Sequence, residues 1–241
     1  MIYVLIGLFL LMWSLFIYHV IKGKRLRGFY FKGFTSFMFI TVFIYGIFYA
    51  ETSVFPEPII LVLNVTELRL ILFMGLGLVL GLIGDLILEV QYFHEDHKNE
   101  QISFGMIAFG LGHIFYILAL TNYYMFNPWA LLIGGLMVGV VYFGSKLMKI
   151  DFKSLAIMSY MYTFVIFTMV GLSVLVYFSH YTQGALVFMI GAILFGVSDL
   201  LLAPIYFKAE KSKLFVVGNL STYYLGQLFI ALSIMFVLNI R

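Results

Sequence analysis

Residues 68–90 read LRLILFMGLGLVLGLIGDLILEV, an apolar stretch with a single aspartate, Asp85, near its end. A helix that spans a membrane needs about 20 consecutive apolar residues, so this stretch is long enough to cross a bilayer. Residues 182–203 read TQGALVFMIGAILFGVSDLLLA and place Asp199 at the corresponding point. A carboxylate inside hydrocarbon costs about 2.5–3.5 kcal/mol on insertion scales. Two of them at matched positions therefore indicate functional residues in a membrane protein.

The composition of the whole chain supports an integral membrane protein. Hydrophobic residues make up 63% of its 241 residues and charged residues only 10%, whereas soluble domains carry about 25% charged residues. The chain has no cysteine, which excludes disulfides, thiol nucleophiles and zinc sites built on cysteine. The small net charge of +3 gives no indication of nucleic acid as a partner, and none is expected.

The hydrophobic pattern predicts an all-α fold, in which residues 1–241 form a single transmembrane domain, a polytopic bundle of eight helices. The spanning stretches are 2–21, 33–50, 68–90, 102–121, 128–148, 154–178, 182–203 and 214–238. The first stretch has no basic residues before it and no small-residue cleavage site, so we expect a retained helix rather than a signal peptide. Residues 55–66 are too short to span and are expected to form an interfacial or re-entrant segment.

Lysines and arginines gather in alternate connections of this arrangement. The connections that follow the first, third, fifth and seventh spans hold almost all of them, and the other side has only Arg69 and the terminal Arg241. The positive-inside rule therefore predicts that these four connections face the cytoplasm and that both termini lie outside. We expect a multi-pass protein of the bacterial inner membrane, and the sequence leaves its oligomeric state open.

An offset of 114 residues relates polar positions in two parts of the chain. The related pairs are Asp85 and Asp199, Gly112 and Gly226, and His113 and Gln227. We therefore predict two parallel four-helix repeats, approximately residues 1–121 and 128–241, related by an axis along the membrane normal as in some transporter folds. The alternative is that short leucine-rich strings match by chance.

Small residues precede both aspartates on the same helical face. Gly81 lies one turn before Asp85, and Gly196 lies about one turn before Asp199. Small residues let neighbouring helices approach closely, so both aspartates are predicted to face the interior of the bundle. Each lies about four or five residues from the cytoplasmic end of its span, which is roughly 6–8 Å at 1.5 Å per residue. The sequence thus predicts a polar cavity that opens to the cytoplasmic leaflet.

Ionisable groups within membrane spans are functional candidates by default. The candidate catalytic residues are Asp85, Asp199 and His113. The candidate substrate-binding residues are Ser198, Tyr116, Tyr223, Tyr224 and Gln227. Structural alternatives stay open, because the aspartates and Gln227 can also form hydrogen bonds between helices, and histidine and tyrosine also serve packing.

Other charged features have simpler explanations. Residues 94–97, His-Glu-Asp-His, look like a metal-binding cluster, but they lie in a hydrophilic connection and lack the His-Glu-x-x-His spacing. No metal or other cofactor is therefore expected. Glu89, one turn beyond the first aspartate, is predicted to be a solvated helix end. Lys208, Lys211 and Lys213 either attract a lipid phosphate or only set the topology.

Four motifs, in their order and spacing, resemble those of the YhhN family of membrane proteins. They are Gly84-Asp85 with its leucine-rich tail, Phe104-Gly105 leading through Phe109-Gly110-Leu111-Gly112-His113 to Tyr116, Gly191-Ala192-Ile193-Leu194-Phe195 running into Ser198-Asp199, and Thr222-Tyr223-Tyr224-Leu225-Gly226-Gln227. The resemblance covers most of the third, fourth, seventh and eighth spans. The chain departs from the family at Lys32-Gly33, where members often have Lys-Pro.

Characterised members of this family are lysoplasmalogenases, so the resemblance implies a lysoplasmalogenase-like ether hydrolase. Such an enzyme cleaves the vinyl ether bond of a lysoplasmalogen and releases a fatty aldehyde and glycerophospho-ethanolamine or -choline. The resemblance also implies a lysophospholipid as substrate, and hence a role in lipid metabolism within the bilayer.

Hydrolysis of a vinyl ether requires a strong general acid, a negative charge near the oxocarbenium ion and a positioned water. Two carboxylates in different protonation states can supply all three, and burial favours the neutral acid for one of them. The sequence does not assign the two roles. His113 or Tyr224 is expected to orient the water or to donate to the leaving oxygen. The alternative function is a proton-coupled transporter of a small molecule or lipid, which would use the same aspartates and need access from both faces.

Overall fold

The computed structural model describes residues 1–54, 63–93, 95–208 and 212–238. Within these ranges the chain forms eight long α-helices and two short 3-10 turns. The helices are α1 (Ile2–Ile21), α2 (Arg25–Val54), α4 (Val65–Val90), α5 (Lys98–Tyr124), α6 (Trp129–Met148), α7 (Ala156–His180), α8 (Gln183–Phe207) and α9 (Lys213–Leu238), and the turns are η1 (Glu95–His97) and η2 (Lys153–Leu155).

All eight helices are long and apolar enough to cross a membrane, which confirms the predicted all-α bundle. The predicted boundaries are close to those observed, except that α2 begins at Arg25 rather than at residue 33. Helix α4 begins earlier than expected because Asn64 and Glu67 form a capping box, in which each side chain accepts a hydrogen bond from the other's backbone N–H at 2.9 Å. Most of the predicted re-entrant segment, residues 55–62, lies outside the described residues.

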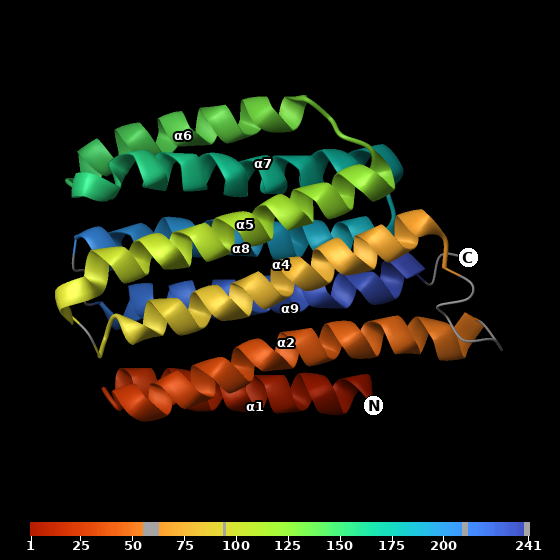
Figure 1. Cartoon of the computed structure of the whole chain (residues 1–241), viewed down its shortest axis with the longest axis horizontal. Helices are drawn as coiled ribbons and strands as arrows, with labels where there is room; N and C mark the ends of the chain where they lie inside the picture. The colour runs from red at the N-terminus through yellow and green to blue at the C-terminus, as the bar shows by residue number, and fades with distance from the viewer. Residues whose placement is uncertain (55–62, 94, 209–211, 239–241) are drawn as a thin grey trace.

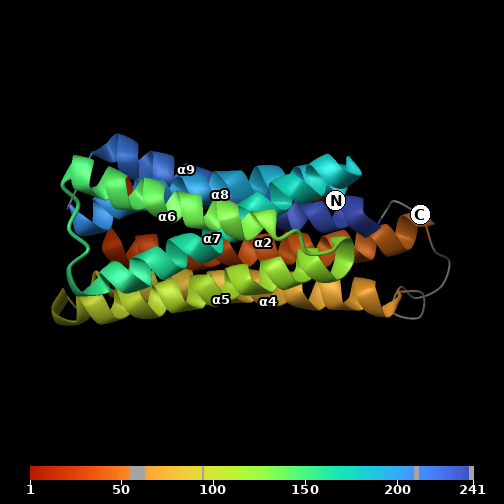
Figure 2. The ribbon, with the colours of Figure 1, turned by 90° about the horizontal axis from the view of Figure 1, so that it is seen from above.

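The helices are arranged as a central group of four with a hairpin on each side. Helices α4, α5, α8 and α9 form the centre, and the pairs α1–α2 and α6–α7 flank it on opposite sides (Figures 1 and 2). Helix α2 packs on α4 and α9, while α7 packs on α5 and α8. Each half of the chain therefore places its second helix against the central helices of both halves.

Helices α1, α4, α6 and α8 end on the same side of the molecule, on the left in Figure 1, and Met1 lies on the opposite side. The connections after the first, third, fifth and seventh spans therefore lie on one side of the molecule, as the sequence predicts. The assignment of that side to the cytoplasm stays a prediction.

Glycine pairs allow the central helices to cross closely. A Cβ on Gly112 of α5 would lie 3.1 Å from the carbonyl oxygen of Gly77 on α4. In the other central pair, a Cβ on Gly226 of α9 would lie 2.9 Å from the carbonyl oxygen of Gly191 on α8. These are distances at which any larger side chain forces the backbones apart. Both members of the second pair are 114 residues beyond those of the first, so the crossings lie where the predicted repeat would make them equivalent.

Candidate functional site

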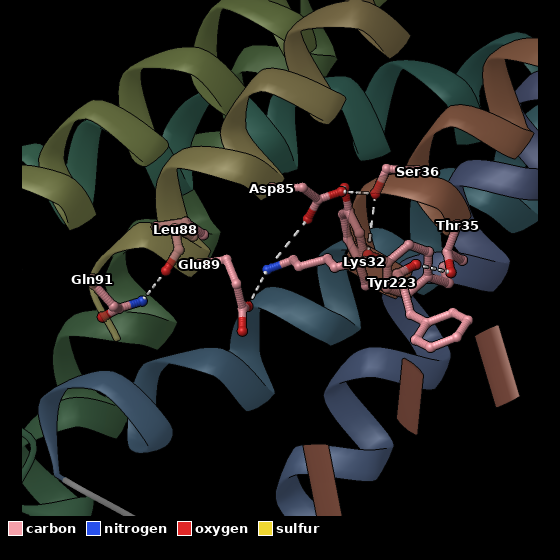
Figure 3. Close-up of polar contacts among 10 residues, drawn as sticks. Lys32, Thr35, Ser36, Asp85, Leu88, Glu89, Gln91 and Tyr223 are labelled. Atoms are coloured by element: carbon pink, nitrogen blue, oxygen red, sulfur yellow. Dashed lines mark hydrogen bonds and ion pairs between the residues drawn. The ribbon is translucent and has the colours of Figure 1, made fainter. Parts of the chain in front are cut away.

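Asp85 is buried in α4, 2% exposed, and is surrounded by groups that stabilise its ionised form. Its Oδ2 accepts hydrogen bonds from Ser36 Oγ on α2 and from the Tyr223 hydroxyl on α9, both at 2.6 Å. Its Oδ1 lies 3.7 Å from Lys32 Nζ. Figure 3 shows these groups converging on the carboxylate. Burial disfavours the charge of a carboxylate, and the two short hydrogen bonds and the nearby ammonium group oppose that effect.

Lys32 and Glu89 form a buried ion pair beside this carboxylate. Lys32 Nζ donates to Glu89 Oε2 at 3.2 Å, and the two residues are each 6% exposed. The ammonium group lies between the two carboxylates of α4 (Figure 3). The predictions that Lys32 belongs to a connection and that Glu89 is a solvated helix end were therefore wrong. The reason is that helix α2 begins before the apolar stretch and carries its lysine into the bundle, where the buried charges neutralise one another.

Asp199 of α8 has a different environment. It is partly buried, its Oδ2 is inaccessible and has no hydrogen-bond partner, and no ion pair among the described residues involves it. Its polar neighbour is Tyr162 of α7, whose hydroxyl interacts with the carboxyl group. A carboxyl oxygen that is buried without a donor disfavours the charged form of its group, because nothing replaces the water that this oxygen has lost.

The positions related by the predicted 114-residue repeat carry different side chains beside the two carboxyl groups. The hydroxyl of Tyr223 bonds to Asp85, and the position 114 residues earlier is Phe109. Phe109 also lines the cavity beside Asp199, but its ring has no hydroxyl to donate. Each aspartate retains a hydroxyl from a flanking helix, Ser36 for the first and Tyr162 for the second. At this position of the predicted repeat, Asp85 therefore has a hydroxyl donor that Asp199 lacks.

Both aspartates line one cavity, which we call the polar cavity. Its wall also includes the predicted residues Ser198 and Tyr223. It extends to the turn between α1 and α2, where Gly23, Lys24 and Arg25 line it, and the remaining polar lining residues are Lys32, Glu89, Tyr92, Tyr162, Tyr206 and Asn219. The Arg25 guanidinium lies over the Tyr92 ring, 4.0 Å from its centroid. The lining residues thus come from the side of the bundle on which α1, α4 and α8 end.

His113 is not on the wall of this cavity. Its Nδ1 donates to the Phe109 carbonyl oxygen at 2.6 Å, which leaves Nε2 as an acceptor that is buried without a partner. The ring packs against Phe195, with centroids 4.2 Å apart. Phe195 of α8 itself lines the polar cavity, so His113 lies behind the Phe195 ring.

The other three predicted binding residues also lie behind the cavity wall. Tyr116 donates to Gln227 Oε1 at 3.0 Å, so these two side chains satisfy each other between α5 and α9. The Tyr224 hydroxyl lies 3.1 Å from Ser36 Oγ, the group that donates to Asp85. Tyr116, Tyr224 and Gln227 thus lie close to the site but do not line the polar cavity.

Sequence reasoning missed several residues of the site. Ser36, Tyr162 and Asn219 were not singled out, and Asn219 Nδ2 donates to the Ser198 carbonyl oxygen at 2.8 Å, which holds α9 to α8 beside Asp199. A signal was present for Asn219 and Lys32, because each is a strongly polar residue within or at the start of an apolar stretch. Ser36 and Tyr162 gave no such signal, since serine and tyrosine are common in membrane helices.

The lysines that the sequence offered for a lipid phosphate are not among the residues found to line the polar cavity. Lys208 and Lys213 do not line the polar cavity, and Lys211 lies outside the described residues. No group of three or more acidic, histidine or cysteine side chains that could hold a metal occurs in the part of the chain that the structure describes. His94 of the metal-like segment is outside that part.

Comparison with known proteins identifies one family. The model of the YhhN family matches residues 54–234, which is most of the chain. No curated protein and no solved structure matches.

Proposed function

We propose that this chain, which belongs to the YhhN family, hydrolyses the vinyl ether bond of lysoplasmalogens within the membrane. The observation that carries the proposal is the pair of carboxyl groups that line one cavity, one surrounded by donors and the other with an oxygen that has none. Acid and base catalysis by two carboxyl groups requires such a division of environments, since one group must hold a proton that the other has lost.

We assign the two roles from the environments of the carboxyl groups. Asp199, with an unpartnered oxygen and no ion pair to any of the described residues, is the general acid. Asp85, with two hydrogen-bond donors and Lys32 beside it, is the carboxylate that stays ionised. Glu89 takes the other side of Lys32 and orients its ammonium group. Asp85 thus places a negative charge near the reacting atoms, where it stabilises a cationic intermediate.

The reaction begins with proton transfer from Asp199 to the vinyl carbon that does not bear the oxygen. The π electrons form the new C–H bond, and the ether oxygen stabilises the resulting oxocarbenium ion. Water then attacks the carbon that bears the oxygen and gives a proton to Asp85, which yields a hemiacetal. When the hemiacetal collapses, Asp85 returns that proton to the leaving ether oxygen, and the hemiacetal hydroxyl gives its proton to Asp199. The products are a fatty aldehyde and the glycerophospho alcohol, and both carboxyl groups regain their initial states.

The test is to measure aldehyde release from a lysoplasmenyl lipid by purified Asp85→Asn and Asp199→Asn variants. Each is expected to reduce the rate by at least about 10²-fold, the typical contribution of a positioned acid or base. The matched control is Asp96→Asn, which makes the same chemical change on an exposed residue and should keep full activity. Full activity in either Asp85→Asn or Asp199→Asn, in protein that elutes and unfolds like wild type, would rule out the two-carboxyl mechanism.

The alternative of proton-coupled transport predicts access to the aspartates from both faces of the membrane. The residues that line the polar cavity come from one side of the bundle, which favours an enzyme. Substrate accumulation in proteoliposomes without aldehyde release would instead support transport.

A further inference from the structure

A second cavity lies next to the polar one, and we call it the apolar cavity. Helices α4 to α8 all contribute to its wall, together with the segment before η2. Its lining residues include Ile102, Met106, Val141, Phe152, Ile166 and Ala203. Apart from Asp199 it contains no charged side chain, so it is suited to hydrocarbon rather than to a polar group.

The two cavities share part of their walls. Six residues line both of them, and these are Leu88, Phe109, Tyr162, Asp199, Leu202 and Tyr206. The carboxyl group assigned above as the acid therefore stands where the polar compartment meets the apolar one. The basic residues Lys24 and Arg25 line the polar cavity but not the apolar cavity.

We propose that the apolar cavity holds the alkenyl chain of the lipid, while Lys24 and Arg25 face its phosphate. This inference rests on the proposed function and extends it to the orientation of the substrate. In a lysoplasmalogen the vinyl ether joins the hydrocarbon chain to the glycerophosphate, so the bond that breaks is also the boundary between the apolar and polar parts. A lipid with its chain in one cavity and its phosphate in the other presents that bond at the shared wall, beside Asp199.

Two residues allow the chain compartment to be tested without touching the acid. Val141 of α6 and Ala203 of α8 line the apolar cavity and are absent from the polar one. Replacing either with phenylalanine fills space in the apolar cavity that a long chain would occupy. Val140 provides a matched control, because it precedes Val141 on the same helix, is 56% exposed and lines neither cavity.

The experiment uses saturated 1-O-alkyl lysophospholipids, which have no vinyl bond and so report binding independently of hydrolysis. Val141→Phe and Ala203→Phe are each expected to weaken binding of the long-chain analogue by about tenfold, the effect of excluding roughly two methylenes from an apolar site. Binding of a short-chain analogue with the same head group should change by less than about twofold, and Val140→Phe should leave both unchanged. The short-chain measurement also shows that each variant is folded.

The inference would be overturned if Val141→Phe and Ala203→Phe bound the long-chain analogue as tightly as the wild type does. It would also be overturned if Val140→Phe weakened that binding as much as they do. Failure of the wild type to release aldehyde, with chain-length-dependent binding intact, would instead count against the proposed hydrolysis and leave the chain compartment standing. The phosphate end is tested by Arg25→Gln, which should weaken binding of the lysophospholipid but not of the corresponding alkylglycerol. An equal effect on the two ligands would remove Arg25 from the binding site.

Discussion

Replacing Lys32 with methionine tests the most unexpected feature of the site. Methionine preserves most of the length and volume of the lysine side chain but removes its charge. Asp85 and Glu89 would then be two carboxyl groups in a buried site with no cation between them. The substitution therefore separates the electrostatic role of Lys32 from its packing.

The magnitude follows from the two distances. At an effective dielectric constant of about 20, a separation of 3.2 Å to Glu89 corresponds to about 5 kcal/mol, and 3.7 Å to Asp85 to about 4.5 kcal/mol. These attractions offset the cost of burying the charges, so the net effect of losing the lysine is smaller than their sum. Breaking a buried ion pair by removing one partner typically costs about 3–5 kcal/mol. We expect a loss of that size, or protonation of the carboxyl groups to avoid it.

Two measurements detect the outcome. Thermal unfolding of the purified protein in detergent should show a clearly lower Tm for Lys32→Met than for wild type. Aldehyde release should fall by at least about 10²-fold, because Asp85 loses the cation that keeps it ionised and available as a base. Lys98→Met is the matched control, since Lys98 is exposed and forms no ion pair among those found in the described residues.

A double variant separates stability from catalysis. Adding Glu89→Gln to Lys32→Met removes one of the two uncompensated carboxylates, so the Tm should recover in part while aldehyde release stays low. The reasoning is refuted if Lys32→Met unfolds at the wild-type temperature and retains wild-type activity. It is also refuted if the double variant is less stable than Lys32→Met alone, because the two buried acids would then not be repelling each other.

Two further predictions concern the hydrogen bonds and the helix crossings. Tyr223→Phe should lower aldehyde release roughly 10- to 100-fold, the effect of losing a hydrogen bond to a charged group of about 1.5–3 kcal/mol. Tyr224→Phe should have a smaller effect, because the hydroxyl of Tyr224 bonds to Ser36 rather than to the carboxylate; equal effects would contradict the direct role of Tyr223. Gly226→Ala should destabilise the protein by about 1–3 kcal/mol because its Cβ would lie 2.9 Å from the Gly191 carbonyl oxygen. Gly139→Ala, where a Cβ meets no atom within 4 Å, is the control in the same unfolding assay, and equal Tm values for the two alanine variants would count against the close crossing.

The prediction of the fold succeeded because it depends on lengths along the chain. Each span needs only enough apolar residues in a row, and eight such stretches can be counted without knowing how they pack. Helix α2 shows the limit of this counting, since it starts at Arg25 and includes a lysine that the apolar stretch leaves out. Counting apolar residues along the chain leaves out Lys32, because the carboxylates that allow its burial lie on another helix, α4.

The sequence pointed to some of the residues that line the polar cavity and not to others, for a related reason. Asp85 and Asp199 stood out because a carboxylate in an apolar span is costly wherever it points. His113 and Gln227 stood out in the same way, but the structure turns them towards Phe195 and Tyr116 rather than into the cavity. Their direction depends on the rotation of each helix about its axis, which is set by the packing of its neighbours.

The sequence by itself determined the eight-helix membrane bundle and the two aspartates, because hydrophobic length and the cost of a buried charge are local properties of each segment. Only the tertiary structure decided that Asp85 is paired with Lys32, Ser36 and Tyr223 while Asp199 keeps an unpartnered oxygen. Those contacts join residues on three helices that lie far apart in the chain. The electrostatic difference between two similar motifs therefore arises from their neighbours in space.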